Sequence, residues 1–280
     1  MGKIFDALEK ANIKAEKVLP KTTPRDRTQK DIGSEKEKVV ALDSALKKTM
    51  EHKPDPTLIT YHDPQSVEAE HFKVLRTNLL FPASGNPPRQ ILVTSALPND
   101  GKSFVASNLA TSIAQGIEEY VMLIDCDLRK STVHNYFGYK QVMGLSEHLS
   151  QGVDLSRVLL KSPVPKLTIL PAGQPPSNPS ELLSSGKMKK LLEEVRNRYD
   201  DRYIIIDSPP PSMASETMAI VKAVDGVILV VRSGRTPKSA VSEAIEQIGK
   251  EKILGVVLNY SDLSLSKYYG YGKKYYKQKD

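Results

Sequence analysis

Cysteine and tryptophan are nearly absent from this chain. Its 280 residues hold one cysteine, Cys126, and no tryptophan, so no intrachain disulfide framework exists. No apolar run approaches the roughly 20 residues that cross a bilayer, and the first residues, MGKIFDALEKA, lack the continuous apolar stretch of a signal peptide. Asp6 stands where an N-myristoylation signal has Ser or Thr. These absences predict a cytoplasmic protein with no membrane span of its own.

The composition is that of a soluble globular protein, with 26% charged and 39% apolar residues. A chain of this length can bury a full core, as one domain of about 200 residues with extensions. The net charge of +7 is concentrated in the two ends, residues 1–60 and 261–280. A basic end can meet nucleic acid, anionic lipid or an acidic partner, although a solvated tail has the same composition. We expect no specific nucleic-acid partner.

Short continuous apolar runs recur beyond Ser66, and each has the length and composition of a buried parallel strand. They are RQILVTS (89–95), YVMLID (120–125), LTILPA (167–172), YIIID (203–207), GVILVV (226–231) and ILGVVLN (253–259). Helices are expected between them, at residues 66–81, 102–115, 178–198, 215–223 and 238–249. This alternation predicts an α/β fold with a mostly parallel sheet covered by helices on both faces.

We divide the chain into three parts. Residues 1–60 combine a short amphipathic helix, whose apolar residues share one face, with a linker rich in Lys, Asp and Pro. Residues 61–262 form the α/β domain, and residues 263–280 form a tail. The N-terminal helix is a candidate docking segment, or it packs on its own domain.

The segment ALPNDGKS, Ala96 to Ser103, lies between an apolar strand and a helix, which is the context of a phosphate-binding loop. Backbone N–H groups of the loop and of the helix start would cradle the phosphates of a nucleotide. Lys102 should reach the β- and γ-phosphates, and Ser103 should ligate Mg²⁺. Ala96 replaces the usual first glycine. The expected nucleotide-binding residues here are Pro98, Asn99, Asp100, Gly101, Lys102, Ser103 and Phe104.

Three carboxylates follow two further strands. Asp125 and Asp127 come at the end of VMLID and just beyond it, and Asp207 ends YIIID. Buried alone, such acids would repel and raise each other's pKa, whereas Mg²⁺ and a nucleotide would compensate their charge. Asp207 has the position of a Walker B carboxylate, which holds Mg²⁺ directly or through water. The sequence therefore predicts a nucleotide and metal site at this end of the sheet.

Over residues 60–280 the chain resembles the bacterial tyrosine kinases, the P-loop autokinases of capsular and exopolysaccharide synthesis. The resemblance is carried by the loop of form x-x-P-x-x-GKS, by LIDCDLR, by DSPP after Asp207 and by LPAGQPPSNPSELLSS (170–185). It implies a P-loop NTPase-like fold that uses ATP and Mg²⁺. It also implies that Lys102 and Asp125 are catalytic, with Asp125 as the proton acceptor from a tyrosine hydroxyl. By the same resemblance, Asp127 and Asp207 are associated with Mg²⁺.

The resemblance extends to assembly and to the base of the nucleotide. The family's ExxRxxR helix builds a ring of subunits, and Glu70, Lys73 and Arg76 occupy those positions here, with Lys73 in place of an arginine. A solvated charged helix face is the alternative. Arg232 and Asn259 end strands where the base should lie, so both are candidate nucleotide-binding residues. A separate membrane protein, the family's chain-length regulator, would recruit the kinase to the inner face of the cell membrane.

The tail holds five of the twelve tyrosines of the chain in its last thirteen residues. They are Tyr268, Tyr269, Tyr271, Tyr275 and Tyr276. Together with a nucleotide site, they predict an autokinase that phosphorylates the tail of a neighbouring copy. An aromatic and basic stretch that binds RNA or membrane would look similar, as would an inert end.

The function predicted is that of an ATP-dependent protein-tyrosine autokinase that regulates exopolysaccharide or capsule synthesis or export. The principal alternative is a P-loop ATPase of the partitioning or site-placement type. Those relatives usually carry a second lysine in the loop and lack a tyrosine tail, whereas residues 97–100 are Leu-Pro-Asn-Asp. A scaffold that holds ATP without turnover is a third possibility, which the intact carboxylates disfavour.

Overall fold

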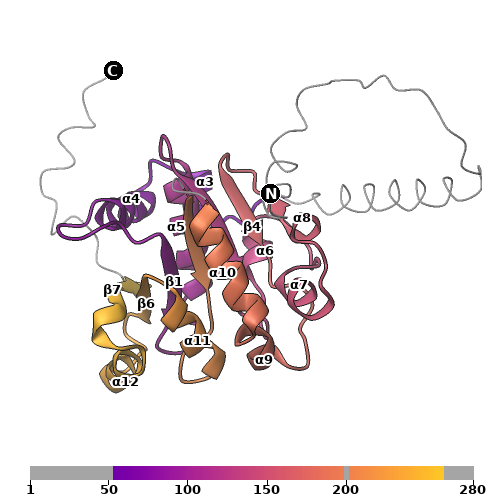
Figure 1. Cartoon of the computed structure of the whole chain (residues 1–280). Helices are drawn as coiled ribbons and strands as arrows, with labels where there is room; N and C mark the ends of the chain where they lie inside the picture. Colours follow the sequence, from indigo (N-terminus) through magenta and orange to yellow (C-terminus); the bar gives the residue numbers. More distant parts are fainter. Residues whose placement is uncertain (1–52, 199–201, 262–280) are drawn as a thin grey trace, which may run out of the picture.

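The computed structural model describes residues 53–198 and 202–261. Its centre is a seven-stranded sheet in the order β3-β4-β2-β5-β1-β6-β7 (Figure 1). The strands are β1 (Gln90–Ser95), β2 (Tyr120–Asp125), β3 (Leu160–Lys161), β4 (Leu167–Leu170), β5 (Arg202–Asp207), β6 (Gly226–Arg232) and β7 (Ile253–Asn259). All neighbouring pairs are parallel except β3 with β4. The predicted α/β, mostly parallel architecture is confirmed.

Helices cover both faces of this sheet (Figure 1). The first face carries α3 (Ile59–His62), α4 (Val67–Leu80), α5 (Lys102–Ala114) and α6 (Val133–Tyr136). The second carries α7 (Leu145–Gln151), α8 (Leu155–Val158), α9 (Pro179–Leu183), α10 (Gly186–Arg198), α11 (Ser215–Ala223) and α12 (Lys238–Ile248). A 3-10 turn, η1 (Lys250–Lys252), leads into β7.

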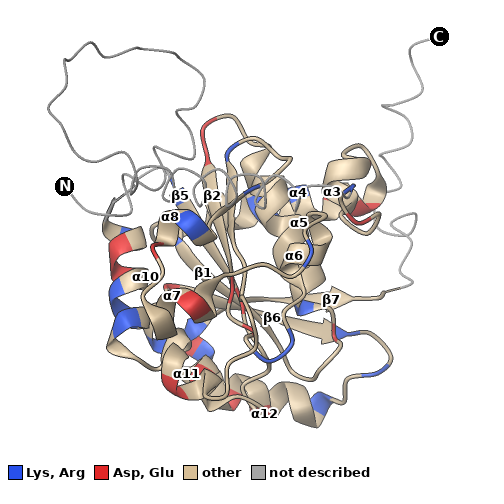
Figure 2. Cartoon of the chain, turned by 90° about the vertical axis from the view of Figure 1, so that its right-hand side faces the viewer, with Lys and Arg blue, Asp and Glu red and all other residues tan. Residues whose placement is uncertain are grey.

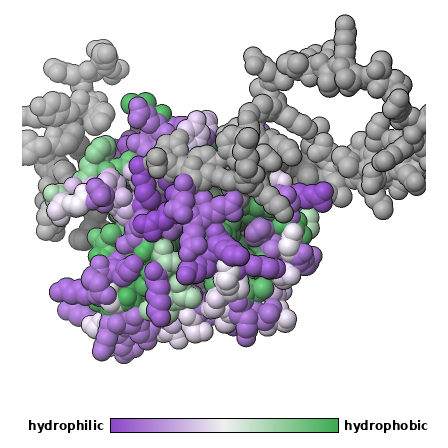
Figure 3. All heavy atoms as spheres, viewed as in Figure 1, coloured by the Kyte–Doolittle hydropathy of each residue, from purple (hydrophilic) through white to green (hydrophobic). Residues whose placement is uncertain are grey.

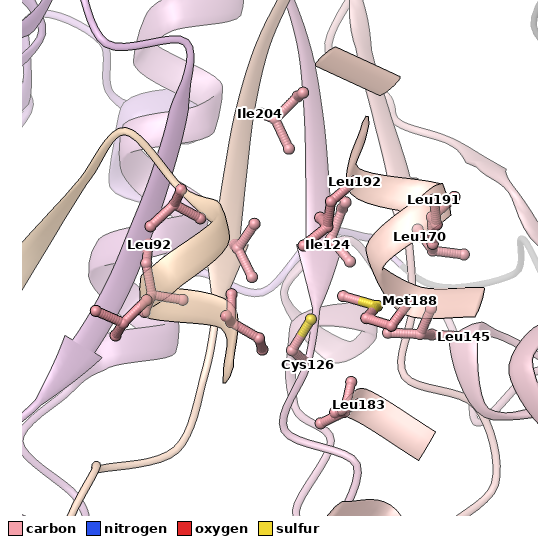
Figure 4. Packing of buried hydrophobic residues seen from close by; sticks show 14 of the residues in the cluster. Leu92, Ile124, Cys126, Leu145, Leu170, Leu183, Met188, Leu191, Leu192 and Ile204 are labelled. Atoms are coloured by element: carbon pink, nitrogen blue, oxygen red, sulfur yellow. The ribbon is translucent and has the colours of Figure 1, made fainter. Parts of the chain in front are cut away.

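Alternation along the strands divides the core into two apolar layers. Leu92, Ile124 and Ile204 face the layer under α7–α12, whereas their neighbours Ile91, Leu123 and Ile205 face the layer under α4 and α5. Successive strand side chains point to opposite faces, so a strand buried on both sides must be apolar throughout. Figure 4 shows Cys126, which is fully buried, among the side chains of the layer under α7–α12.

The outer surface of α10 is strongly charged. Acidic and basic residues are interspersed along it, and this helix lies on the solvent side of the second face (Figure 2). Hydrophilic side chains are abundant on the face of the molecule that Figure 3 shows, which has the view of Figure 1. The apolar residues of α10, among them Leu191 and Val195, are buried against the sheet. The amphipathic pattern therefore explains why this helix lies flat on the sheet.

Several expected elements differ in detail. The helix expected at 178–198 is two helices, α9 and α10, because the chain turns at Ser184 and Ser185 before restarting at Gly186. Four short helices, α3, α6, α7 and α8, were not expected, and neither was β3, whose two residues pair antiparallel with β4. Elements of two to seven residues carry too little periodicity to be recognised in a sequence.

Residues just before position 61, the predicted start of the α/β domain, already pack against this domain. Leu58 is fully buried, and the Thr60 hydroxyl and backbone N–H both donate to Asn108 of α5. The N-terminal helix predicted within residues 3–13 and the tyrosine tail from residue 263 lie outside the described residues. Among the residues that are described, no helix is both long and apolar enough to cross a membrane.

Candidate active site

The strands β2, β5 and β1 are neighbours, and their carboxyl ends hold the predicted site. In the register of the sheet, Val93 pairs with Asp207, and Asp207 pairs with Asp125. The carboxyl edge of an open parallel sheet is where such folds bind ligands. The loop after β1 therefore reaches both carboxylates, and the structure brings Lys102, Ser103, Asp125, Asp127 and Asp207 together.

The loop after β1 is held by the side chain of Asp100. This buried carboxylate accepts hydrogen bonds from the Leu97 N–H (3.0 Å) and from the Thr236 hydroxyl (2.8 Å). Asn99 and Gly101, on either side of it, have positive φ angles of 66° and 97°. The Asp100 side chain thus fixes the shape of the loop, and its contribution to nucleotide binding stays a prediction. Recognition of phosphate is left to backbone N–H groups, the donors that phosphate-binding loops use.

Lys102 lies at the centre of a buried cluster of opposite charges. Its Nζ is 2.8 Å from Asp127 Oδ2 and 3.9 Å from Asp207 Oδ1. Burial favours the neutral amine, but Asp207 and Asp127 outweigh it and raise the pKa of Lys102 above its usual value. The lysine is therefore fully charged at neutral pH. The Ser103 hydroxyl, on the next residue of α5, donates to Asp207 Oδ2 at 2.5 Å.

Asp125 is the carboxylate whose protonation changes near neutrality. It is fully buried, and burial, followed by the charge of Asp207, raises its pKa to about 7. Lys102 opposes this shift. A buried acid with a pKa near the working pH can accept and release a proton efficiently, which is the property required of a general base.

One oxygen of this cluster has no hydrogen-bond partner. Asp207 Oδ1 is buried and accepts no hydrogen bond, although Asp207 Oδ2 is bonded to Ser103. Burial also raises the pKa of Asp207. An orphaned carboxylate oxygen next to a serine hydroxyl and Asp127 fits a divalent cation, since Mg²⁺ prefers oxygen ligands. The described residues hold no cluster of three or more His, Cys, Asp or Glu suited to a metal, so phosphate oxygens would have to complete the coordination.

The two residues predicted near the base lie close to the loop but have partners within the protein. The Asn259 amide donates to the Asp100 carbonyl at 2.9 Å, and a Cβ at Gly101 would come within 2.0 Å of its nitrogen. Glycine is therefore required at position 101 both by its φ and by Asn259. The Arg232 guanidinium lies over the ring of Tyr260, 4.1 Å from its centroid. Tyr260 was not predicted to lie near the loop.

Two further predicted nucleotide-binding residues lie at the edges of the loop. Phe104 turns its ring toward Phe72 of α4, with centroids 5.8 Å apart in an edge-on arrangement. Pro98 is exposed in the loop. Phe104 thus ties the start of α5 to α4, and its contribution to nucleotide binding stays a prediction.

The predicted oligomerisation residues lie on α4, away from the carboxylate cluster. Glu70 and Lys73 pair with each other at 3.0 Å on the exposed side. Arg76 points inward and donates to the Ser112 carbonyl of α5 at 2.8 Å. Of the three, Glu70 is exposed, whereas Lys73 and Arg76 are half-buried.

An ion pair between a buried carboxylate and a partly exposed arginine, beside the site, was missed by the sequence analysis. Glu216, 1% exposed at the start of α11, accepts hydrogen bonds from Arg129 Nε (3.1 Å) and the Ser180 hydroxyl (2.7 Å). These contacts join α9, α11 and the loop after β2. Burial acts to raise the pKa of Glu216, but the hydrogen bond from its own backbone N–H and then those from Ser180 and Arg129 outweigh burial and lower it. Arg129 therefore anchors the loop that carries Asp127, which the spacing of the motif could not reveal.

Comparison with known proteins identifies the family. A model described as an AAA domain matches residues 98–253. Tyrosine-protein kinase YwqD of Bacillus subtilis is 35% identical over 229 residues, which cover 81% of this chain and 95% of YwqD. The solved kinase domain of the Escherichia coli tyrosine kinase ETK has a TM-score of 0.66 and 31% identity, covering 74% of this chain and 82% of that domain. The chain belongs to the bacterial tyrosine-protein kinases.

The kinase thus has a P-loop fold of the kind that implies nucleotide binding, and the resemblance seen in the sequence is confirmed. The alternative of a site-placement ATPase fits less well. The septum site-determining protein of Pyrococcus horikoshii shares 20% identity at a TM-score of 0.51, a likeness of fold alone. The kinase region also occurs inside longer chains, since the match to full-length Etk of E. coli covers 70% of this kinase but 27% of Etk.

Proposed function

We propose that this kinase transfers the γ-phosphoryl group of ATP to tyrosine hydroxyls in the C-terminal tail of a neighbouring copy. The products are ADP and phosphotyrosine. The observation that supports this most is the buried cluster in which Lys102 lies between Asp127 and Asp207, directly after a phosphate-binding loop. Positioning and charge neutralisation are what phosphoryl transfer requires of a protein.

Each residue of the cluster has a distinct role in this proposal. The loop backbone and Lys102 bind the phosphates, and Lys102 neutralises charge that develops on the transferring group. The tyrosine oxygen attacks the γ-phosphorus while its proton passes to Asp125. The bond from the γ-phosphorus to the β,γ-bridging oxygen breaks, and ADP leaves with that oxygen.

Ser103, Asp127 and Asp207 would hold Mg²⁺. The cation, when bound, supplies electrostatic stabilisation of the phosphate oxygens. Because Lys102 Nζ is 2.8 Å from Asp127 in the present arrangement, that contact would give way when phosphates attract the lysine. Incubation with labelled ATP and Mg²⁺, followed by mapping of phosphotyrosine, tests the function. A chain that hydrolyses ATP without forming phosphotyrosine would be an ATPase of the alternative kind.

The cellular role that we propose is regulation of exopolysaccharide or capsule synthesis or export. A separate membrane protein of the chain-length regulator type would hold the kinase at the inner face of the membrane. The proposal is supported by the family and by the occurrence of the same kinase region in relatives of very different length. Phosphorylation would add about −1.5 to −2 charges at each tail tyrosine. Several such groups would reverse the charge of the tail and release it from its neighbour.

We expect the kinase to assemble through α4. Changing Glu70, Lys73 and Arg76 to alanine should convert an oligomer into a monomer in light scattering and reduce phosphorylation in trans. Since Arg76 also bonds the Ser112 carbonyl within its own chain, the double change of Glu70 and Lys73 is the cleaner variant. Lys189 and Glu193 form a comparable exposed pair on α10. Alanine at Lys189 and Glu193 should leave the mass of the oligomer unchanged. If the Glu70 and Lys73 double variant also keeps that mass, α4 has only a solvated charged face and no role in assembly.

Binding of nucleotide with Mg²⁺ should release protons near neutral pH. The pKa of Asp125 is raised to about 7, so this acid is partly protonated in the free protein at neutrality. A cation beside it favours the carboxylate, so the proton leaves on binding. Titration calorimetry of Mg²⁺ and ADP in buffers of different ionisation enthalpy should show release at about pH 7 and almost none at about pH 9.5. Asp125→Asn should reduce the release, whereas proton uptake would contradict the assignment.

A further inference from the structure

A chain of hydrogen bonds extends from Asp125 into the protein, beyond the residues assigned so far. The Ser131 hydroxyl lies 3.0 Å from Asp125 Oδ2, and it also lies 3.0 Å from His134 Nδ1. Ser131 belongs to the loop after β2, and His134 lies in α6. No residue beyond Asp127 in this loop entered the sequence analysis as part of the site.

The hydrogen bonds to Asp125 are distributed unequally between its two oxygens. Oδ2 accepts hydrogen bonds from the Ser131 hydroxyl and from the backbone N–H groups of Thr132 (3.3 Å) and Val133 (3.2 Å). The bond from the hydroxyl is the shortest of the three. Oδ1 accepts a single bond, from the Asp127 N–H at 3.0 Å. Oδ2 is therefore saturated, and Oδ1 keeps capacity to accept one more proton donor.

His134 fixes the direction of the Ser131 hydroxyl. A serine hydroxyl has one hydrogen, so when it donates to Asp125 it must accept from His134, whose Nδ1 then carries the proton. Burial lowers the pKa of His134, and the side chain is 7% exposed, so the imidazole is neutral and its ring has little freedom to turn. The order of donation is thus His134 to Ser131 to Asp125.

We propose that Ser131 and His134 are positioning residues for phosphoryl transfer, which hold the Asp125 carboxylate so that Oδ1 faces the incoming tyrosine hydroxyl. This inference rests on the proposed role of Asp125 as the proton acceptor. A general base works only within hydrogen-bond reach of the proton that it takes, so a rotation of its carboxylate lowers the rate of transfer. Neither residue meets the nucleotide in this scheme, so binding of ATP is independent of both.

The first test compares Ser131→Ala with Ser131→Thr. The alanine variant removes the shortest hydrogen bond to Oδ2, and we expect the single-turnover rate of tyrosine phosphorylation at saturating ATP and Mg²⁺ to fall on the order of tenfold. The threonine variant keeps a hydroxyl at the same position and should recover the rate. The dissociation constant of a fluorescent ATP analogue should stay within about twofold in both. A fully active alanine variant, or equal losses in the two variants, would overturn the proposal.

The second test changes His134, which is one hydrogen bond further from Asp125 than Ser131 is. His134→Asn places an amide N–H near the position of the imidazole Nδ1, whereas His134→Leu has a similar volume and no donor. We expect the leucine variant to be several-fold slower than the asparagine variant, at equal melting temperatures and equal ATP affinity. Equal rates would mean that His134 only fills space in the core.

A double-mutant cycle separates positioning from general stability. If Ser131 acts through Asp125, then adding Ser131→Ala to Asp125→Asn should cost no further rate, because residues that act as a unit are non-additive. A further tenfold loss would show that Ser131 acts elsewhere. Absence of phosphotyrosine in the wild-type kinase would instead remove the proposed function itself, so the two failures are distinguishable.

Discussion

Lys102→Met should abolish tyrosine phosphorylation while the protein stays folded. The lysine is the one cation that the structure places between Asp127 and Asp207 among the described residues, and its charge would be lost from the transferring phosphoryl group. Removal of one such preorganised contact costs on the order of 10²–10³ in rate in other enzymes. Methionine keeps most of the length of the side chain, so the packing around α5 is preserved. Quantitative phosphotyrosine immunoblotting checks the result.

A matched control for this change is Lys190→Met, which removes an exposed lysine of α10 far from the carboxylate cluster in sequence and on the other face of the sheet. It should leave both the phosphotyrosine signal and the melting temperature nearly unchanged. Circular dichroism should show the same helix content in both variants. A Lys102→Met protein with near wild-type phosphotyrosine would rule out the assignment of the loop as the catalytic phosphate site.

Replacing the five tail tyrosines by phenylalanine should nearly eliminate phosphotyrosine without affecting ATP binding. Tyr268, Tyr269, Tyr271, Tyr275 and Tyr276 keep their rings in this variant and lose only the hydroxyls that accept the phosphoryl group. Affinity for a fluorescent nucleotide, measured beside phosphotyrosine, separates loss of the acceptor from loss of the site.

Mixing two inactive proteins gives the sharper result. The five-phenylalanine variant supplies an intact active site, and Lys102→Met supplies intact tails. Labelling should reappear, and mass spectrometry should find it only on the Lys102→Met chains. Label on Tyr61, Tyr136 or Tyr203 instead would mean that the tail is not the acceptor. Tyr203 is 5% exposed on β5, so its phosphorylation would also require the sheet to open.

The sequence was sufficient for every strand of the sheet except β3, and for the edge of the sheet at which the predicted site residues gather, and the reason is physical. Strands buried on both faces are apolar without interruption, and a loop with Gly-Lys-Ser or a carboxylate after such a strand must lie at its carboxyl end. Asp125 and Asp207 could therefore be assigned to one edge of the sheet before their pairing was known. The long helices α4, α5, α11 and α12 were recognisable for a related reason, since ten or so residues suffice to show a helical period.

What the sequence did not reveal depends on contacts between distant residues. Arg76 has the spacing of an exposed motif, yet it bonds the Ser112 carbonyl 36 residues away. Glu216 was not singled out in the sequence, since only the fold brings Arg129 and Ser180 to it. The orientation of Asp125 is set by Ser131 and His134, whose roles follow from hydrogen-bond geometry rather than from spacing.

The buried position of Cys126 gives the chain an internal reporter of unfolding. Burial, and after it the neighbouring carboxylates, raise the pKa of this thiol, and its side chain is fully inaccessible. Thiolate is the reactive form, so alkylating reagents should modify the folded protein only as fast as the strand-end region opens. As Cys126 is the single cysteine, the rate of modification needs no correction for other sites. Ligands that bind at the neighbouring nucleotide site should slow this reaction. The alkylation rate would then measure how far bound nucleotide reduces opening of the strand-end region.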